Sequence, residues 1–179
     1  EIGFELFSLV EIGPGEGTLS RDLILAISEI APSLKSKIEI VLVELNAGMR
    51  ERQEKVVNKL EGINCRWSNI EDLILRPVTG VIVANEVLDA FPVERLVFTD
   101  NKVFRQGVSL RRINDDYYLE FVDLMPTSLI INFLNDSNSL LKIEFPPKDI
   151  CNRWVTEWHC DLPSWFRKLS NILRNGSLL

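Results

Sequence analysis

The hydrophobic pattern in the first half of the chain alternates between short apolar runs and longer segments with helical spacing. Four runs have the length of buried strands and occur at 6–12, 38–44, 63–67 and 80–84. Apolar residues recur every three or four positions over 19–30, and the same spacing returns over 49–60. Strands that alternate with amphipathic helices predict an α/β fold with a doubly wound, mainly parallel sheet.

Local signals place the ends of the predicted helices. Thr18 is expected to cap the first helix with its hydroxyl oxygen, and Pro32 is expected to end it, because proline cannot continue the hydrogen bonding. Asn46 is expected to cap the second helix, which Gly62 ends. A further helical segment of one or two turns is expected at 70–75.

The pattern changes to a period of two between Val93 and about Leu124. This period predicts antiparallel strands, with a turn at 114–116. A helix is expected over 128–141. We therefore expect an antiparallel insertion, an inserted β-rich and helical lobe at 93–145.

The last third of the chain is expected to return to the parallel sheet. An extended segment is expected over 142–145 and a helix over 163–174, capped by Asn175 and Gly176. A fifth strand would then begin at Ser177.

Composition and charge narrow the class of partner. With 179 residues, 46% of them apolar, the chain can bury the core of a single domain, residues 1–179. A net charge of −6 and an isoelectric point near 4.9 disfavour binding to nucleic acid phosphates or anionic lipid. Three separated cysteines and one histidine give neither a disulfide framework nor a zinc-ligand spacing, and no apolar stretch is long enough to span a membrane. We therefore expect no metal, no nucleic acid partner and no membrane span, and the oligomeric state stays open.

A glycine-rich turn follows the first predicted strand. Gly13, Gly15 and Gly17 stand at every second position, where positive φ angles would let the backbone turn sharply and approach a ligand. The spacing differs from the dinucleotide pattern G-x-G-x-x-G, because Thr18 stands where the third glycine would be. The Glu11 carboxylate, just inside the strand end, suits a cationic ligand better than a pyrophosphate. The turn therefore predicts a nucleotide-type pocket for a positively charged ligand.

Polar residues also follow the second and fourth predicted strands. In an open α/β sheet, ligands bind beyond the carboxyl ends of the strands, so these residues should share one pocket with the glycine turn. Glu44 follows Gly17 by 27 residues, which places its carboxylate where a ribose diol would lie. Asn85, Glu86 and Asp89 follow the fourth strand. The two carboxylates of this last group could clamp the planar fork of an arginine guanidinium.

Three segments carry a family resemblance: V-E-I-G-P-G-E-G-T-L from Val10, V-L-V-E-L-N from Val41, and V-I-V-A-N-E-V-L-D-A-F-P-V from Val81. With Arg50, Gln53, Trp67, Glu157 and Gly176, they resemble the MidA-type S-adenosylmethionine-dependent methyltransferases, whose mitochondrial members assist respiratory complex I assembly. The resemblance implies a Rossmann-like class I methyltransferase fold. In that family the pattern continues beyond the position of Gly176, so C-terminal strands are expected to be missing from this sequence.

The resemblance also implies a cofactor and a reaction. The cofactor would be S-adenosyl-L-methionine and the reaction methyl transfer to a protein arginine, with Glu86, Asp89 and Asn85 as catalytic residues. The acceptor would be a protein such as a respiratory-complex subunit, in the mitochondrial matrix of a eukaryote or the cytoplasm of a bacterium. The residues expected to bind the cofactor are Glu11, Gly13, Pro14, Gly15, Gly17, Thr18, Leu19, Glu44, Leu45, Asn69 and Asn85.

Two other classes of protein remain open at this point. One is a non-catalytic assembly or binding protein that retains a methyltransferase-like pocket, and the other is a NAD-type oxidoreductase, which Thr18 and Glu11 disfavour. Trp67 and Phe91 could flank adenine or the substrate, or could pack in the core. The carboxylates at the strand ends could likewise be solvated surface charges.

Overall fold

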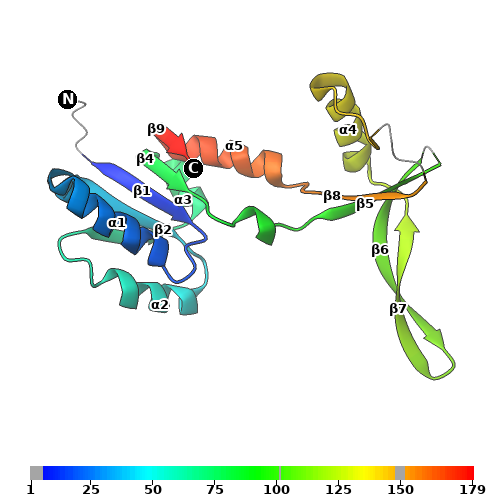
Figure 1. The fold of residues 1–179 in the computed structure, drawn as a ribbon, viewed down its shortest axis with the longest axis horizontal. Helices are drawn as coiled ribbons and strands as arrows, with labels where there is room; N and C mark the ends of the chain where they lie inside the picture. The colour runs from blue at the N-terminus through cyan, green and yellow to red at the C-terminus, as the bar shows by residue number, and fades with distance from the viewer. Residues whose placement is uncertain (1–5, 101, 148–151) are drawn as a thin grey trace. The chain divides into compact units, whose positions relative to one another are not determined.

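A computed structural model describes residues 6–100, 102–147 and 152–179 (Figure 1). The chain divides into two compact units. The first unit contains Glu1–Phe91 and Leu162–Leu179, and the second unit contains Pro92–Asp161. The second unit therefore extends beyond the predicted lobe at 93–145.

The first unit is built on a parallel sheet of five strands in the order β3-β2-β1-β4-β9 (Figure 1). Strand β1 pairs with β2 on one side and with β4 on the other, so the strand order reverses at β1. The strands are β1 (Phe7–Ile12), β2 (Ile38–Val43), β3 (Asn64–Ser68), β4 (Val78–Val83) and β9 (Leu173–Leu178). The prediction of an α/β fold with a doubly wound parallel sheet is confirmed.

Helices cover both faces of this sheet. They are α1 (Thr18–Ile30), α2 (Ala47–Val57), α3 (Ile70–Leu75) and α5 (Leu162–Ile172), and a 3₁₀ helix (Pro32–Lys37) follows α1. On one face, Ile24 of α1 and Val57 of α2 pack against Ile40 of β2. On the other face, Leu73 of α3 and Leu169 of α5 belong to a second buried cluster. Because strand residues alternate between the two clusters, burial on both faces explains why the strands read as continuous apolar runs.

Three predicted helix ends differ from the structure. Helix α2 ends at Val57, so Gly62 does not end it. Thr18 is the first residue of α1, and the cap position is occupied by Gly17, which has no side chain to offer. Helix α5 ends at Ile172, so Asn175 and Gly176 lie within β9 and do not cap a helix. The Asn-Gly pair is a local cap signal, but pairing of β9 with β4, from Val78–Leu173 to Ile82–Leu178, prevails over it.

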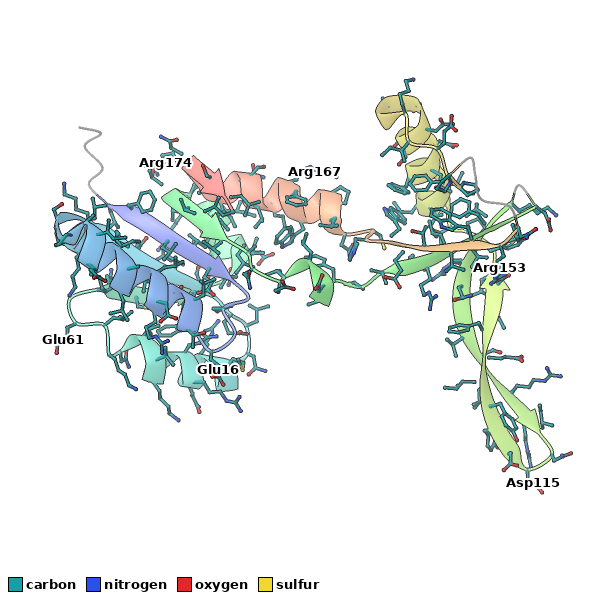
Figure 2. The ribbon with its side chains drawn as sticks, in the orientation of Figure 1. Glu16, Glu61, Asp115, Arg153, Arg167 and Arg174 are labelled. Atoms are coloured by element: carbon teal, nitrogen blue, oxygen red, sulfur yellow. The ribbon has the colours of Figure 1, made fainter. Side chains whose placement is uncertain are left out.

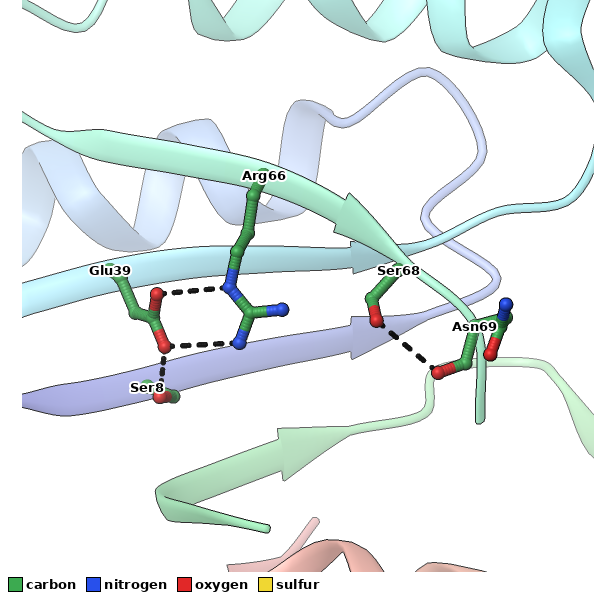
Figure 3. Close-up of polar contacts among 5 residues, drawn as sticks. All are labelled: Ser8, Glu39, Arg66, Ser68 and Asn69. Atoms are coloured by element: carbon green, nitrogen blue, oxygen red, sulfur yellow. Dashed lines mark hydrogen bonds and ion pairs between the residues drawn. The ribbon is translucent and has the colours of Figure 1, made fainter. Parts of the chain in front are cut away.

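A buried carboxylate lies inside the first sheet (Figure 3). Glu39 of β2 is 5% exposed and accepts a hydrogen bond of 2.6 Å from Ser8 Oγ on β1. Arg66 of β3 donates to the same carboxylate from Nε at 3.1 Å and from Nη2 at 3.3 Å. The Glu39 charge is therefore compensated by a two-pronged guanidinium contact across three neighbouring strands, as a buried charge requires.

The second unit is an antiparallel sheet in the order β7-β6-β5-β8 with one helical segment. Its elements are β5 (Glu94–Thr99), β6 (Lys102–Ile113), β7 (Asp116–Leu124), α4 (Ser128–Asp136), a π-helical turn (Ser137–Leu141) and β8 (Trp154–Trp158). The predicted antiparallel strands and the turn near 114 are confirmed. Strand β8 was not predicted, and its pairing with β5 explains why the unit continues beyond residue 145. The segment 142–145, expected to be extended, contains no strand.

Candidate active site

Four parallel strands of the first unit end at the same edge of the sheet. The glycine turn follows β1 and Glu44 follows β2, while Asn69 follows β3 and Asn85 follows β4. Glu16 of the glycine turn is labelled in Figure 2. The strand order reverses at β1, and such a switch point is where open α/β sheets bind ligands.

The glycine turn has the backbone geometry that was predicted. Gly13, Gly15 and Gly17 have φ angles of +64°, +52° and +79°, and Gly17 N donates to the Pro14 carbonyl at 2.7 Å. A Cβ atom on Gly13 would lie 3.1 Å from Cγ2 of Val87, which belongs to the loop after β4. A Cβ on Gly15 would meet no atom within 4 Å, so the backbone there faces open space. The turn can therefore bring peptide groups against a ligand without side chains in between.

Glu11 lies beneath this turn and binds the helix that follows it. Its side chain is 4% exposed and accepts hydrogen bonds from both the backbone N–H and the hydroxyl of Ser20. Ser20 is the third residue of α1, so the carboxylate supplies the helix cap that Gly17 cannot provide. The role of Glu11 toward a cationic ligand stays a prediction.

The burial of Glu11 should make stability depend on pH. Desolvation raises the pKa of the Glu11 carboxyl above its ordinary value of 4.5, and the two hydrogen bonds from Ser20 oppose that shift. Because the pKa of Glu11 is higher in the folded state, protonation of this carboxyl favours folding. The stabilisation is fully present below pH 4.5 and is lost as the pH rises through the folded-state pKa. As the pH rises from about 4.5 to 7, the free energy of unfolding, measured in urea, should therefore increase less for the native chain than for Glu11→Gln. Identical pH slopes would contradict this account, and Glu16→Gln, which removes an exposed carboxylate from the same turn, is the control.

The Glu44 carboxylate is half-buried and held in place by its neighbours. Oε1 accepts from the backbone N–H of Asn46 at 2.8 Å, and Oε2 accepts from Gln53 Nε2 at 3.4 Å. Arg50 Nε donates to the Glu44 carbonyl at 2.7 Å. Asn46 caps α2 by accepting from Met49 N, as predicted. The carboxylate retains acceptor capacity on both oxygens, which a diol could use.

The sequence did not predict a role for Gln53 in the site. The structure places it on the buried face of α2, completely inaccessible to solvent, with Nε2 donating to the Gly15 carbonyl at 2.7 Å. Its Oε1 accepts from Nε1 of Trp67 at 2.7 Å. A signal was present in the sequence, because Gln53 lies four positions from both Met49 and Val57 on the predicted apolar face. A polar residue there is expected to have specific partners.

The other predicted cofactor contacts differ in exposure. Leu45 is 78% exposed just beyond β2, and Asn69 caps α3 by accepting from Asp72 N at 2.7 Å. Pro14 is buried, Leu19 is partly buried and Thr18 is exposed.

The loop after β4 alternates between anchoring and exposed side chains. Val87, Leu88 and Phe91 pack against the core of the first unit, and the Phe91 ring meets the Trp165 ring edge-on at 5.4 Å. Phe91 is thus a packing residue. The exposed polar side chains of the same loop are Asn85, Glu86 and Asp89, and Glu86 has a φ of +56°. Both carboxylates are therefore accessible to a ligand from solvent.

Three further features of the described residues concern metal binding, membrane spanning and thiol reactivity. Within 6–100, 102–147 and 152–179, no three His, Cys, Asp or Glu side chains gather as metal ligands. None of the helices in those same ranges combines the length and apolar character needed to cross a bilayer. Burial raises the pKa of the Cys65 thiol to about 11, so this thiol is not a nucleophile at neutral pH.

A parallel sheet with a glycine turn and acidic residues at its carboxyl edge defines a Rossmann-like nucleotide-binding class. Comparison with known families is more specific: the chain belongs to the family described as "Putative S-adenosyl-L-methionine-dependent methyltransferase", which residues 3–179 match. No curated protein matches the chain.

Two solved structures from Burkholderia thailandensis are similar to this chain. One is described as a "likely methyl transferase" bound to S-adenosyl-homocysteine, with 25% identity and a TM-score of 0.71 over 96% of this chain and 40% of that one. The other is described as an uncharacterized protein, with 25% identity and a TM-score of 0.69 over 96% of this chain and 41% of that one. The chain therefore spans about two fifths of the length of these relatives. Neither the oxidoreductase nor the non-catalytic alternative receives support from these comparisons.

Proposed function

We propose that the first unit binds S-adenosyl-L-methionine at the carboxyl edge of its sheet and that the protein transfers the methyl group to a protein arginine side chain. The observation that carries this proposal is the convergence of the glycine turn, the Glu44 carboxylate and the exposed loop after β4 at one edge. The family match and the S-adenosyl-homocysteine bound to the Burkholderia relative support the choice of cofactor.

The residues at this edge fit the cofactor. Glu44 would accept hydrogen bonds from the two ribose hydroxyls, and Leu45, exposed beside it, would contact the adenine ring. Peptide groups of the glycine turn would face the methionine portion, because the backbone at Gly15 is open. When bound, the cofactor supplies an activated methyl group on its sulfonium. The proposed contacts are Glu11, Gly13, Pro14, Gly15, Gly17, Thr18, Leu19, Glu44, Leu45, Asn69 and Asn85.

The loop after β4 would hold the acceptor. Glu86 and Asp89 are exposed carboxylates that would bind the planar guanidinium and orient its nitrogen toward the methyl group. Asn85 would accept a hydrogen bond from the same group. Methylation releases one proton from the guanidinium, and either carboxylate can accept it. The chemistry calls for a basic protein acceptor, and the resemblance suggests a respiratory-complex subunit.

Glu44→Ala tests the cofactor site. Loss of hydrogen bonds to a charged acceptor should weaken S-adenosyl-homocysteine binding by roughly 1.5–3 kcal/mol. Calorimetric titration measures this directly, with Glu51→Ala on the exposed side of α2 as the control and NAD as the competing ligand. Unchanged affinity in Glu44→Ala would remove Glu44 from the site, and binding of NAD in place of S-adenosyl-homocysteine would overturn the choice of cofactor.

A further inference from the structure

The Gln53 side chain connects three parts of the proposed cofactor site. It is completely buried, and its amide nitrogen donates to the Gly15 carbonyl at 2.7 Å and to Glu44 Oε2 at 3.4 Å. Its amide oxygen accepts from Trp67 Nε1 at 2.7 Å. One side chain on α2 thus contacts the turn after β1, the carboxylate after β2 and an aromatic residue of β3.

The chemistry of the partners determines which way this amide points. The Trp67 indole can only donate, while the Gly15 carbonyl and the Glu44 carboxylate can only accept. The oxygen of Gln53 must therefore face the indole and its nitrogen must face the two acceptors. An ionised glutamate, which has the same length, could only accept at this position.

Packing reinforces the connection. A Cβ on Gly17 would lie 3.5 Å from Cγ of Gln53, so the glycine turn rests directly on the stem of this side chain. Without the Gln53 amide, the Glu44 carboxylate would keep only the hydrogen bond from the Asn46 N–H among the residues that the structure describes. A less constrained carboxylate must be ordered again each time a ligand binds, which lowers affinity.

We infer that Gln53 is a positioning residue that fixes the glycine turn, the Glu44 carboxylate and the Trp67 ring in the arrangement that receives the cofactor. This inference rests on the proposed function. Gln53 acts through these three neighbours and does not contact the cofactor itself. Its contribution should therefore appear in cofactor affinity and should depend on the donor capacity at this position.

Gln53→Glu is the sharpest test because it keeps the length and shape of the side chain and replaces the amide donor with an ionisable acceptor. At about pH 8 the new carboxylate would face the Gly15 carbonyl and the Glu44 carboxylate, and S-adenosyl-homocysteine affinity should fall by about 30-fold or more. Burial beside a like charge favours protonation of the new carboxyl, which then regains one O–H donor. Lowering the pH to about 6 should therefore recover a substantial part of the lost affinity, while the native chain shows no such gain. Lys55→Gln changes the net charge equally on the exposed face of α2 and serves as the control.

A second variant keeps the test decisive if Gln53→Glu does not fold. Trp67→Phe keeps an aromatic ring but removes the indole N–H together with the pyrrole part of the ring, so affinity should fall by roughly threefold to tenfold in a protein that still unfolds cooperatively. Native affinity in both variants, or a loss in Gln53→Glu that is independent of pH and matches a fall in melting temperature, would overturn the positioning role. Failure of the native chain to bind S-adenosyl-homocysteine would instead count against the proposed function.

Discussion

Glu86→Gln and Asp89→Asn should each abolish methyl transfer to a basic protein acceptor while leaving S-adenosyl-homocysteine affinity within about threefold of the native value. Both side chains are exposed on the loop after β4, and the packing of that loop depends on its apolar residues Val87, Leu88 and Phe91. Each amide keeps the shape of the carboxylate but loses the charge that binds a guanidinium and accepts its proton. The lost interaction belongs to the acceptor and the transition state, so the effect should appear in turnover.

The measurement pairs two readouts on the same protein samples. Incorporation of tritiated methyl groups reports turnover, and calorimetric titration reports cofactor affinity. Glu29→Gln, an exposed carboxylate on α1, is the matched control and should keep full activity. Full activity in both loop variants would exclude the carboxylate clamp. Loss of cofactor binding in either would move that residue into the cofactor site.

Gly80→Ala should abolish or nearly abolish folding of the first unit. A Cβ on Gly80 would lie 1.9 Å from the Ser8 carbonyl oxygen and 2.7 Å from the Ser8 carbonyl carbon, both backbone atoms of the central strand β1. Backbone atoms in a hydrogen-bonded sheet cannot move aside as the end of a flexible side chain can. We expect a loss of at least about 3–5 kcal/mol, in the range of the most damaging core substitutions.

Urea unfolding followed by circular dichroism measures this loss. Gly48→Ala is the matched control, because a Cβ there would approach only the side-chain oxygen of Asn46, at 3.3 Å, in the first turn of α2. Alanine is a better helix former than glycine, so this control should change stability by less than about 1 kcal/mol. A Gly80→Ala protein as stable as the control would show that β1 and β4 can separate without cost.

The parallel sheet could be predicted because its strands are buried on both faces and connected by amphipathic helices. Each apolar run before Ala84 corresponds to a strand within about two residues at either end. Strand β8 could not be predicted in the same way. Its five residues, Trp154–Trp158, have no turn signal of their own, and they form a strand because β5, far away in the sequence, is available as a partner.

The candidate site was predictable to a similar extent. The positions of the glycine turn, Glu44 and the loop after β4 follow from the rule that ligands lie beyond the carboxyl ends of parallel strands. The hydrogen bonds between different elements of the site do not follow from any local pattern. Ser20 binds the Glu11 carboxylate because α1 begins directly above it, and Gln53 meets Trp67 because α2 packs over the sheet. Such contacts depend on tertiary packing, which spacing along the sequence does not encode.

The late return of the chain to its first sheet sets an order of events during synthesis. Strand β4 pairs with β9 from Val78–Leu173 onward, and the whole second unit lies between these strands in the sequence. At usual ribosomal rates, the edge of β4 stays without this partner for roughly 5–20 seconds after it emerges. An unpaired strand edge with apolar neighbours can pair with another chain during that time. In a nascent chain with this topology, the edge of β4 therefore stays open to such contacts until β9 pairs with it.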